Sequence, residues 1–103
     1  MKKTKLSANG TSYHGVNITT TVQELIDILG EPTHVENTGE DKVNFEWNCI
    51  TSNEDIVTIY DWKEYRPISK DEVIEFHIGG HTLSHTLDAQ KELSKIILQN
   101  NLV

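Results

Sequence analysis

Most of the side chains in this 103-residue chain that could do chemistry gather in two stretches, residues 59–67 and 75–81. The first holds three of the five Trp and Tyr residues and the only arginine, and the second holds a glycine pair between two histidines. Trp, Tyr and Arg are enriched where binding energy concentrates, and their flat groups can stack on a nucleobase. We predict a ligand-binding site formed by Trp62, Lys63, Tyr65, Arg66, His77, Gly79, Gly80 and His81.

The glycine pair stands where a predicted strand passes into a predicted helix, at residues 79–82. Such a junction exposes free backbone amides at the start of a helix, which suit a phosphate or a carboxylate. It matches no phosphate-loop consensus, and a tight turn with positive φ is the ordinary explanation of such glycines. For the first stretch, the ordinary alternative is that Trp62 completes the core and Arg66 pairs with Glu64 or Asp71.

Three histidines, His77, His81 and His85, are each separated by three residues. On one continuous helix this spacing would form a metal-binding face, but the glycine pair divides the set between a strand and a helix. His77 and His81 could still meet Asp61, which leaves a small metal- or histidine-dependent hydrolase as the alternative function. The usual enzyme constellations are missing, because adjacent Ser84 and His85 do not place a nucleophile on its base. We therefore expect a binding protein with no catalytic residues, no metal and no cofactor.

The net charge of −7 is concentrated in the middle of the chain, where residues 31–75 hold twelve acidic and four basic side chains. This acidity argues against direct nucleic-acid binding, which needs Lys and Arg to displace counterions. It permits an acidic surface that faces a basic partner protein, although solubility is the ordinary explanation of the same charge.

The length allows one domain with one core, and the hydrophobic content of 36% makes that core thin. A homodimer would bury additional apolar surface. No apolar run is long enough to span a membrane, and polar residues follow the basic start where a signal peptide needs its apolar segment. With Cys49 as the only cysteine, we expect a cytoplasmic protein, in the host cytoplasm if it is encoded by a phage.

The clearest predicted element is a helix over about residues 21–29. Thr21 and Glu24 have capping-box spacing, and apolar residues recur at helical intervals after them. Gly30 suits a left-handed C-cap, and Pro32 prevents the helix from continuing.

Period-two alternation and β-branched residues predict strands over residues 13–18, 43–49, 56–62 and 73–78. Cys49 falls on the apolar face of the second, where it is an inert core thiol. We expect the glycine pair to end the last strand, before a helix from Thr82 or Ser84 to about Leu98. Its sheet-facing residues would be Leu87, Leu93, Ile96 and Ile97.

These elements predict an α+β fold, a three- to four-stranded antiparallel sheet with two helices packed on one face. Residues 1–11 would be a flexible segment, and residues 12–103 a single α+β domain.

The motif Ile-Tyr-Asp-Trp-Lys-Glu-Tyr-Arg-Pro at residues 59–67, followed by Glu-Phe-His-Ile-Gly-Gly-His at 75–81, resembles a group of small uncharacterised bacteriophage proteins. The resemblance covers roughly residues 20–97 and implies an accessory protein that counteracts host defences. The end of the first helix, residues 29–33, is also similar to the helix–hairpin unit of β-lactamase-inhibitor-like and outer-membrane-assembly modules.

Together, these observations predict a non-enzymatic anti-defence protein in one of two versions. In the first, the protein sequesters a nucleotide signal, with Gly79, Gly80 and His81 on the phosphate, Arg66 and Lys63 supplying charge, and Trp62 or Tyr65 stacking. In the second, the acidic region 31–75 blocks the basic groove of a nucleic-acid-handling effector such as a CRISPR nuclease.

Overall fold

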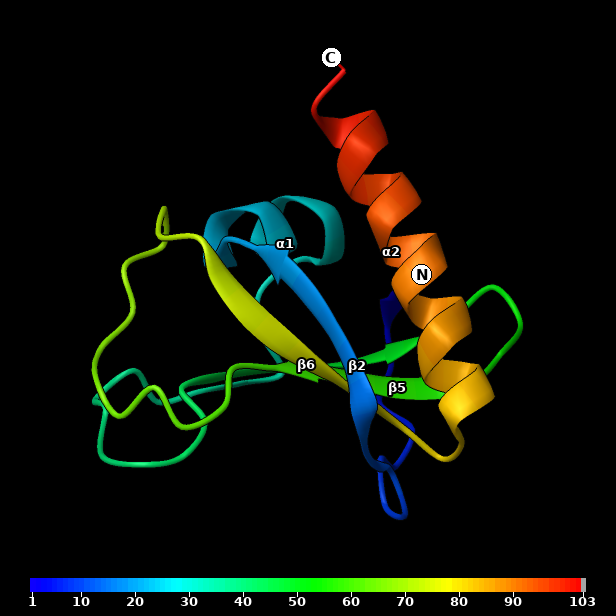
Figure 1. Cartoon of the computed structure of the whole chain (residues 1–103), viewed down its shortest axis with the longest axis horizontal. Helices are drawn as coiled ribbons and strands as arrows, with labels where there is room; N and C mark the ends of the chain where they lie inside the picture. The colour runs from blue at the N-terminus through cyan, green and yellow to red at the C-terminus, as the bar shows by residue number, and fades with distance from the viewer. Residues whose placement is uncertain (103) are drawn as a thin grey trace.

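A six-stranded antiparallel sheet forms the centre of the protein, as seen in a computed structural model that describes residues 1–102 (Figure 1). The strands follow the spatial order β1-β4-β5-β6-β2, and β3 pairs with β4 beside β1. Their bounds are β1 Lys2–Lys3, β2 Ser12–Thr20, β3 His34–Val35, β4 Phe45–Ile50, β5 Ile56–Tyr60 and β6 Ile74–Gly80.

Helix α1, Val22–Leu29, confirms the strongest local prediction. The Thr21 hydroxyl accepts a hydrogen bond from the Glu24 amide at 3.0 Å, which satisfies a free donor of the first turn. Gly30 ends the helix with a φ of 91°, a conformation that glycine adopts at no steric cost.

Helix α2, Leu83–Asn100, begins after Thr82, whose hydroxyl accepts from the His85 amide at 3.1 Å. The helix packs across β2, β5 and β6 and also touches α1, on the same side of the sheet (Figure 1). Leu93 is fully buried, whereas Leu87 is 47% exposed, so the prediction that Leu87 faces the sheet is wrong.

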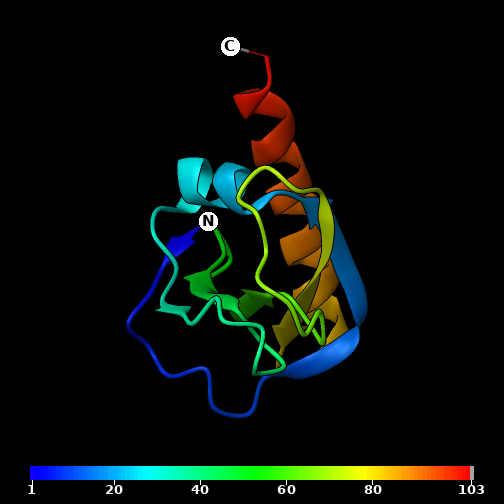
Figure 2. The same cartoon turned by 90° about the vertical axis from the view of Figure 1, so that its left-hand side faces the viewer.

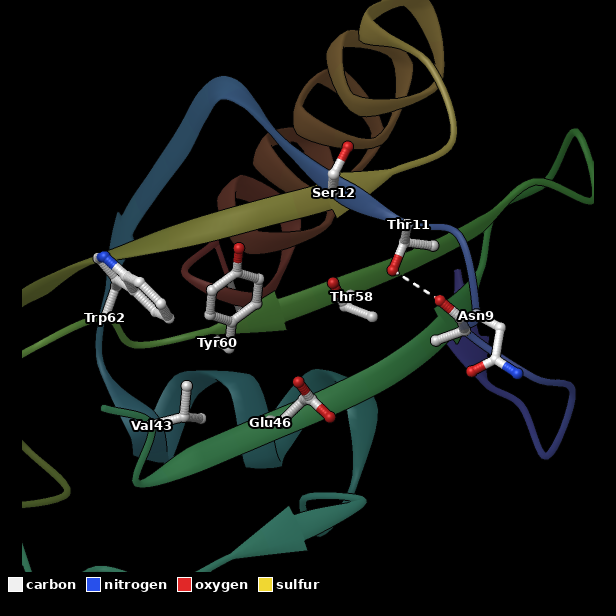
Figure 3. Close-up of a pocket in the computed structure, with 9 residues that line it drawn as sticks. Asn9, Thr11, Ser12, Val43, Glu46, Thr58, Tyr60 and Trp62 are labelled. Carbon is white, nitrogen blue, oxygen red and sulfur yellow. Dashed lines mark hydrogen bonds between the residues drawn. The ribbon is translucent and has the colours of Figure 1, made fainter. Parts of the chain in front are cut away.

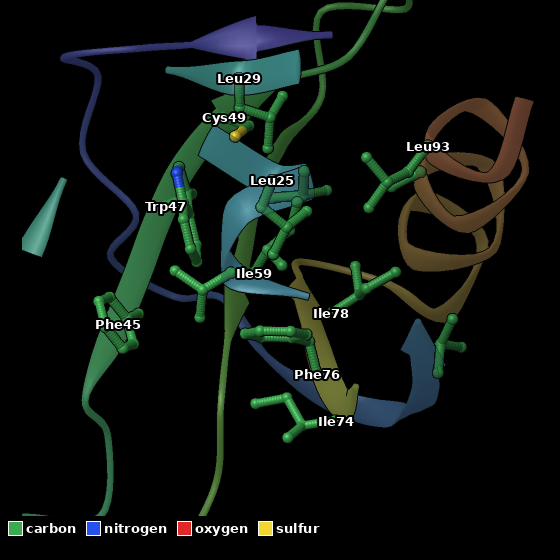
Figure 4. Close-up of a cluster of buried hydrophobic side chains, with 14 of the residues drawn as sticks. Leu25, Leu29, Phe45, Trp47, Cys49, Ile59, Ile74, Phe76, Ile78 and Leu93 are labelled. Atoms are coloured by element: carbon green, nitrogen blue, oxygen red, sulfur yellow. The ribbon is translucent and has the colours of Figure 1, made fainter. Parts of the chain in front are cut away.

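The core lies between the two helices and one face of the sheet (Figure 4). In β4, the alternation that the sequence predicts is realised, because every second residue is buried. Trp47 is fully buried and its indole nitrogen donates to the Gly30 carbonyl at 2.9 Å, which ties the end of α1 to the sheet. The buried apolar residues are Val16, Val22, Leu25, Leu29, Phe45, Trp47, Cys49, Val57, Ile59, Ile68, Ile74, Phe76, Ile78, Ala89 and Leu93.

The sheet is larger than the three to four strands predicted. The additional strands β1 and β3 have two residues each, too few for a period-two pattern to be visible. The N-terminal segment 1–11 carries β1, and the amino group of Met1 lies 2.7 Å from the Glu92 carboxylate on α2. The flexibility of this segment stays a prediction.

The predicted break at the glycine pair is a second correction, because β6 runs through Gly79 and Gly80. A Cβ on Gly79 would lie 2.5 Å from the Thr58 hydroxyl, and one on Gly80 would lie 2.9 Å from Thr86. The glycines therefore allow close packing of neighbouring elements, rather than a turn. Within the described residues, no helix has the length and apolar character needed to cross a membrane.

Candidate ligand-binding face

The face of the sheet opposite the helices is lined by polar and aromatic side chains. Antiparallel pairing aligns His34 with Glu46, Glu46 with Tyr60, Tyr60 with His77, and His77 with Asn17. Residues directly opposite one another on antiparallel strands share a face. This row therefore crosses five strands on the side that the helices leave uncovered.

Four aromatic rings cluster on this face. Tyr13 stacks on His77 with centroids 3.7 Å apart and planes inclined by 10°. Trp62 also lies over His77, at 5.9 Å, and Tyr60 meets His77 and Trp62 edge-on at 5.5 and 6.1 Å. Trp62 is 38% exposed, so part of its ring is free to contact another molecule.

A hollow of about 330 Å³ opens beside this cluster (Figure 3). Glu46, Thr58 and Tyr60 project into it from β4 and β5, and Trp62 and Val43 border one end (Figure 3). The segment before β2 forms the opposite wall, where the Thr11 hydroxyl donates to the Ala8 carbonyl at 2.8 Å. The complete lining is Ala8, Asn9, Thr11, Ser12, Val43, Glu46, Thr58, Tyr60 and Trp62.

A second hollow, of about 450 Å³, shares Val43 and Trp62 with the first and is also lined by His34, Asp41 and Lys42. The ammonium groups of Lys42 and Lys63 lie 5.8 and 5.6 Å from the centre of the Trp62 ring, within cation–π range. Among residues 1–102, no ion pair involves Lys42, Lys63 or Glu46. The two hollows therefore combine aromatic surface with uncompensated charges of both signs.

The connections that precede β4 and follow β5 hold Val43 and Trp62 in place, and they run side by side (Figures 1 and 2). Asp61 is fully buried and accepts from the backbone amides of Asn44 and Phe45 at 2.9 and 2.8 Å. It also accepts from the Asn44 side-chain amide at 3.1 Å. Because Asp61 adjoins Trp62 and Asn44 adjoins Val43, this contact fixes the wall that the two hollows share.

A second link between these connections is the hydrogen bond from the Lys63 amide to the Lys42 carbonyl, at 2.7 Å. Lys63 and Tyr65 have φ values of 56° and 50°, in the left-handed region that is uncommon for residues with a Cβ. The chain therefore turns sharply just after Trp62, which brings both lysines to the same ring.

Burial changes the acid–base properties of two rings on the face. It lowers the pKa of His77, with a weaker opposing effect from the Glu75 carboxylate, so the ring is held in its neutral form. Burial also raises the pKa of Tyr60, and the nearby Glu46 carboxylate and Tyr13 add to the rise. At this point the face is therefore aromatic, and its histidine favours the neutral form.

Of the predicted site residues, the structure brings together Trp62, Lys63 and His77. Arg66 lines neither hollow, and its guanidinium is paired with the carboxylates of Glu72 and Glu64. Tyr65 is 54% exposed and likewise lines neither hollow.

At the junction predicted to bind a phosphate, the structure has a continuous strand followed by a capped helix. Gly79 and Gly80 are buried within β6 and paired with β5 and β2. The helix start after them is capped by the Thr82 side chain. The ring of His81 lies against Gly10, where a Cβ would come within 3.3 Å of it.

The triad required for the hydrolase alternative does not form. Asp61 is engaged by the amides of Asn44 and Phe45, and His81 packs near Gly10. Within residues 1–102, no group of three His, Cys, Asp or Glu side chains is arranged to hold a metal ion.

The prediction from sequence omitted several members of the face, among them Tyr13, Lys42, Glu46 and Tyr60. Strand alternation already placed Glu46 on the other face of β4 from the apolar residues, and this pattern could have identified it. The position of Tyr60 between Glu46 and His77 depends on strand register, which local sequence does not encode.

Comparisons of the chain with protein-family models, with curated proteins and with solved structures found no match. The resemblance to small phage proteins therefore stays a prediction.

Proposed function

We propose that the protein is a small, non-enzymatic binding protein that sequesters a nucleotide-type signalling molecule on the uncovered face of its sheet. In the cytoplasm of a phage-infected cell, this capture would counter a host defence system that depends on the signal. The observation that carries the proposal is the cluster of Tyr60, Trp62 and His77 beside two hollows. The phage setting rests on the sequence resemblance alone.

The aromatic cluster supports a planar ligand because a base can stack on an exposed ring whatever its identity. Trp62 is accessible and lies between the two hollows, so a ring resting on it would leave room for groups on either side. Tyr60 and His77 support Trp62 from beneath, which limits the freedom that the indole would lose on binding.

Lys42 and Lys63 support an anionic group on the ligand. Both ammonium groups approach the Trp62 ring, and neither is neutralised by an ion pair among the described residues. In the prediction from sequence, Arg66 and Lys63 supplied this charge. The pairing of Arg66 with Glu72 and Glu64 favours Lys42 in its place, beside Lys63.

The blocking version has weaker support. Of the acidic residues between positions 31 and 75, Asp61 is buried, and Glu64 and Glu72 are paired with Arg66. The exposed acids are therefore fewer than the sequence suggests, and three lysines of this region, Lys42, Lys63 and Lys70, take part in no ion pair among the described residues. A basic protein would meet a surface of mixed charge.

The first test is a fluorescence titration with a panel of ribonucleotides. Trp47 is fully buried and Trp62 is exposed, so a ligand-dependent change in emission would report on Trp62. We expect Trp62→Ala, measured by isothermal titration calorimetry because the variant lacks the reporting indole, to weaken binding roughly 5- to 150-fold, since stacking on one base contributes about 1–3 kcal/mol. Tyr65→Ala is the matched control, because this exposed ring lines neither hollow.

The second test distinguishes sequestration from catalysis and from blocking. Protein isolated with bound nucleotide and then heat-denatured should release that nucleotide chemically unchanged. Release of a cleaved product would contradict the proposal in favour of an enzyme. Salt-sensitive binding to a basic effector, with no nucleotide bound and no effect of Trp62→Ala, would contradict it in favour of the blocking version.

A further inference from the structure

We infer that the hollow beside Trp62 selects a guanine base, through the carboxylate of Glu46. This inference rests on the proposed nucleotide capture and specifies its ligand class. Glu46 lines the hollow together with Thr58 and Tyr60, and it belongs to the row that crosses the uncovered face. Its carboxylate takes part in no ion pair among residues 1–102, so both oxygens are available to a ligand.

An ionised carboxylate has two oxygens that only accept hydrogen bonds. Guanine presents two adjacent donors on its Watson–Crick edge, the N1–H and the 2-amino group, and can satisfy both oxygens at once. Adenine presents a donor at its 6-amino group beside the lone pair of N1, which would face a carboxylate oxygen and be repelled. A single carboxylate beside a stacking ring therefore discriminates between the two purines.

The surroundings of Glu46 increase this discrimination. Tyr60 lies directly opposite Glu46 in the strand register and is half-buried, so it shields one side of the carboxylate. Thr58, only 5% exposed, lines the floor of the same hollow and leaves its hydroxyl as a further polar group for the base. Hydrogen bonds to a charged group in a partly dried site are stronger than those in open water.

The charges also define an orientation for the ligand. Glu46 lines the first hollow and Lys42 lines the second, with Val43 and Trp62 forming the wall between them. A nucleotide that stacks on Trp62 with its base edge toward Glu46 would direct its phosphates toward Lys42 and His34. The reverse orientation would place the phosphates beside Glu46, in a hollow that no basic side chain lines, whereas the one carboxylate of the second hollow, Asp41, is accompanied by Lys42 and His34.

The test is isothermal titration calorimetry of the full chain with GMP, IMP and AMP. IMP keeps the N1–H but lacks the 2-amino group, so it loses one of the two bonds. We expect affinity to fall roughly tenfold from GMP to IMP and roughly a hundredfold from GMP to AMP, given what a bond to a charged group contributes.

Two variants assign the effect to its residues. Glu46→Gln offers one acceptor and one donor, which matches the edge of adenine, so the GMP preference over AMP should fall to about threefold or less. Lys42→Ala should weaken GDP more than guanosine while leaving the base preference unchanged. If Glu46→Gln does not fold, as judged by its urea transition, the GMP, IMP and AMP series on the wild type still decides whether the hollow selects guanine.

Equal binding of GMP and AMP by the wild type would overturn guanine selection and leave nucleotide capture standing. Retention of the full GMP preference in folded Glu46→Gln would overturn the role of Glu46. Absence of binding by every nucleotide would overturn both the inference and the proposed function.

Discussion

Asp61→Asn should destabilise the protein more than any other single change of charge in the chain. The carboxylate is fully buried and accepts from three donors, the amides of Asn44 and Phe45 and the Asn44 side chain. Asparagine turns one acceptor oxygen into an NH₂ group that faces one of these donors, and the bonds that remain lose their assistance from charge.

The magnitude follows from the bonds that change. A hydrogen bond to a charged group contributes about 1.5–3 kcal/mol, and a neutral one about 0.5–1.5 kcal/mol. Loss of one bond and weakening of the others, offset by the easier burial of a neutral side chain, gives a decrease in unfolding free energy of about 3 kcal/mol. With an m-value of about 1.5 kcal/mol/M, the urea midpoint would fall by about 2 M.

Urea unfolding followed by circular dichroism measures this directly. Asp88→Asn is the matched control, because Asp88 is exposed on α2, and its unfolding free energy should change by no more than about 0.5 kcal/mol. The variant should also bind nucleotide more weakly, because Asp61 adjoins Trp62 and holds the connection that carries Val43. A loss of less than about 1 kcal/mol in Asp61→Asn would refute this account of the two connections.

Three further predictions concern the sheet and its two faces. Gly79→Ala places a Cβ 2.5 Å from the Thr58 hydroxyl and should lower the unfolding free energy, measured in urea, by about 1–3 kcal/mol. The Gly79→Ala/Thr58→Ala double variant should lose less, because it removes the clashing hydroxyl. Folding lowers the pKa of His77, so the unfolded chain binds a proton at a higher pH than the folded chain does. The unfolding free energy of the wild type should therefore decrease as the pH drops below about 6.5, and it should decrease less in His77→Gln. Parallel curves of unfolding free energy for the two proteins from pH 7.5 to 5 would contradict this. Burial raises the pKa of Cys49 to about 12, so the thiol should react with a disulfide reagent only on unfolding, and fast reaction in native buffer would place Cys49 outside the core.

The sequence was sufficient where structure depends on neighbouring residues. Thr21, Glu24 and Gly30 lie within one short segment, and they determine the two ends of α1 through contacts with that same segment. The alternation from residue 43 to 49 likewise predicts the buried face of β4, since side chains of a strand point to opposite sides in turn.

Prediction from sequence was incomplete where structure depends on distant residues. A glycine required by a turn and a glycine required by close packing look the same in a sequence, and Gly79 is of the second kind because of Thr58 on another strand. Trp62 and His77 could be chosen as candidate site residues from their types. The approach of Lys42 to the Trp62 ring depends on the bonds of Asp61 to Asn44 and Phe45, which no local pattern reveals.

The central claim, that nucleotide binds on the uncovered face of the sheet, is tested most directly by ¹H–¹⁵N NMR of the labelled protein titrated with GMP. The two tryptophans give two indole signals, one from exposed Trp62 and one from buried Trp47, whose nitrogen donates to Gly30. We expect the Trp62 indole and the amides of Glu46, Thr58 and Tyr60 to shift together at saturation, while the Trp47 indole stays in place. Shifts confined to residues 79–85, or no shifts with either GMP or AMP at millimolar concentration, would contradict the claim.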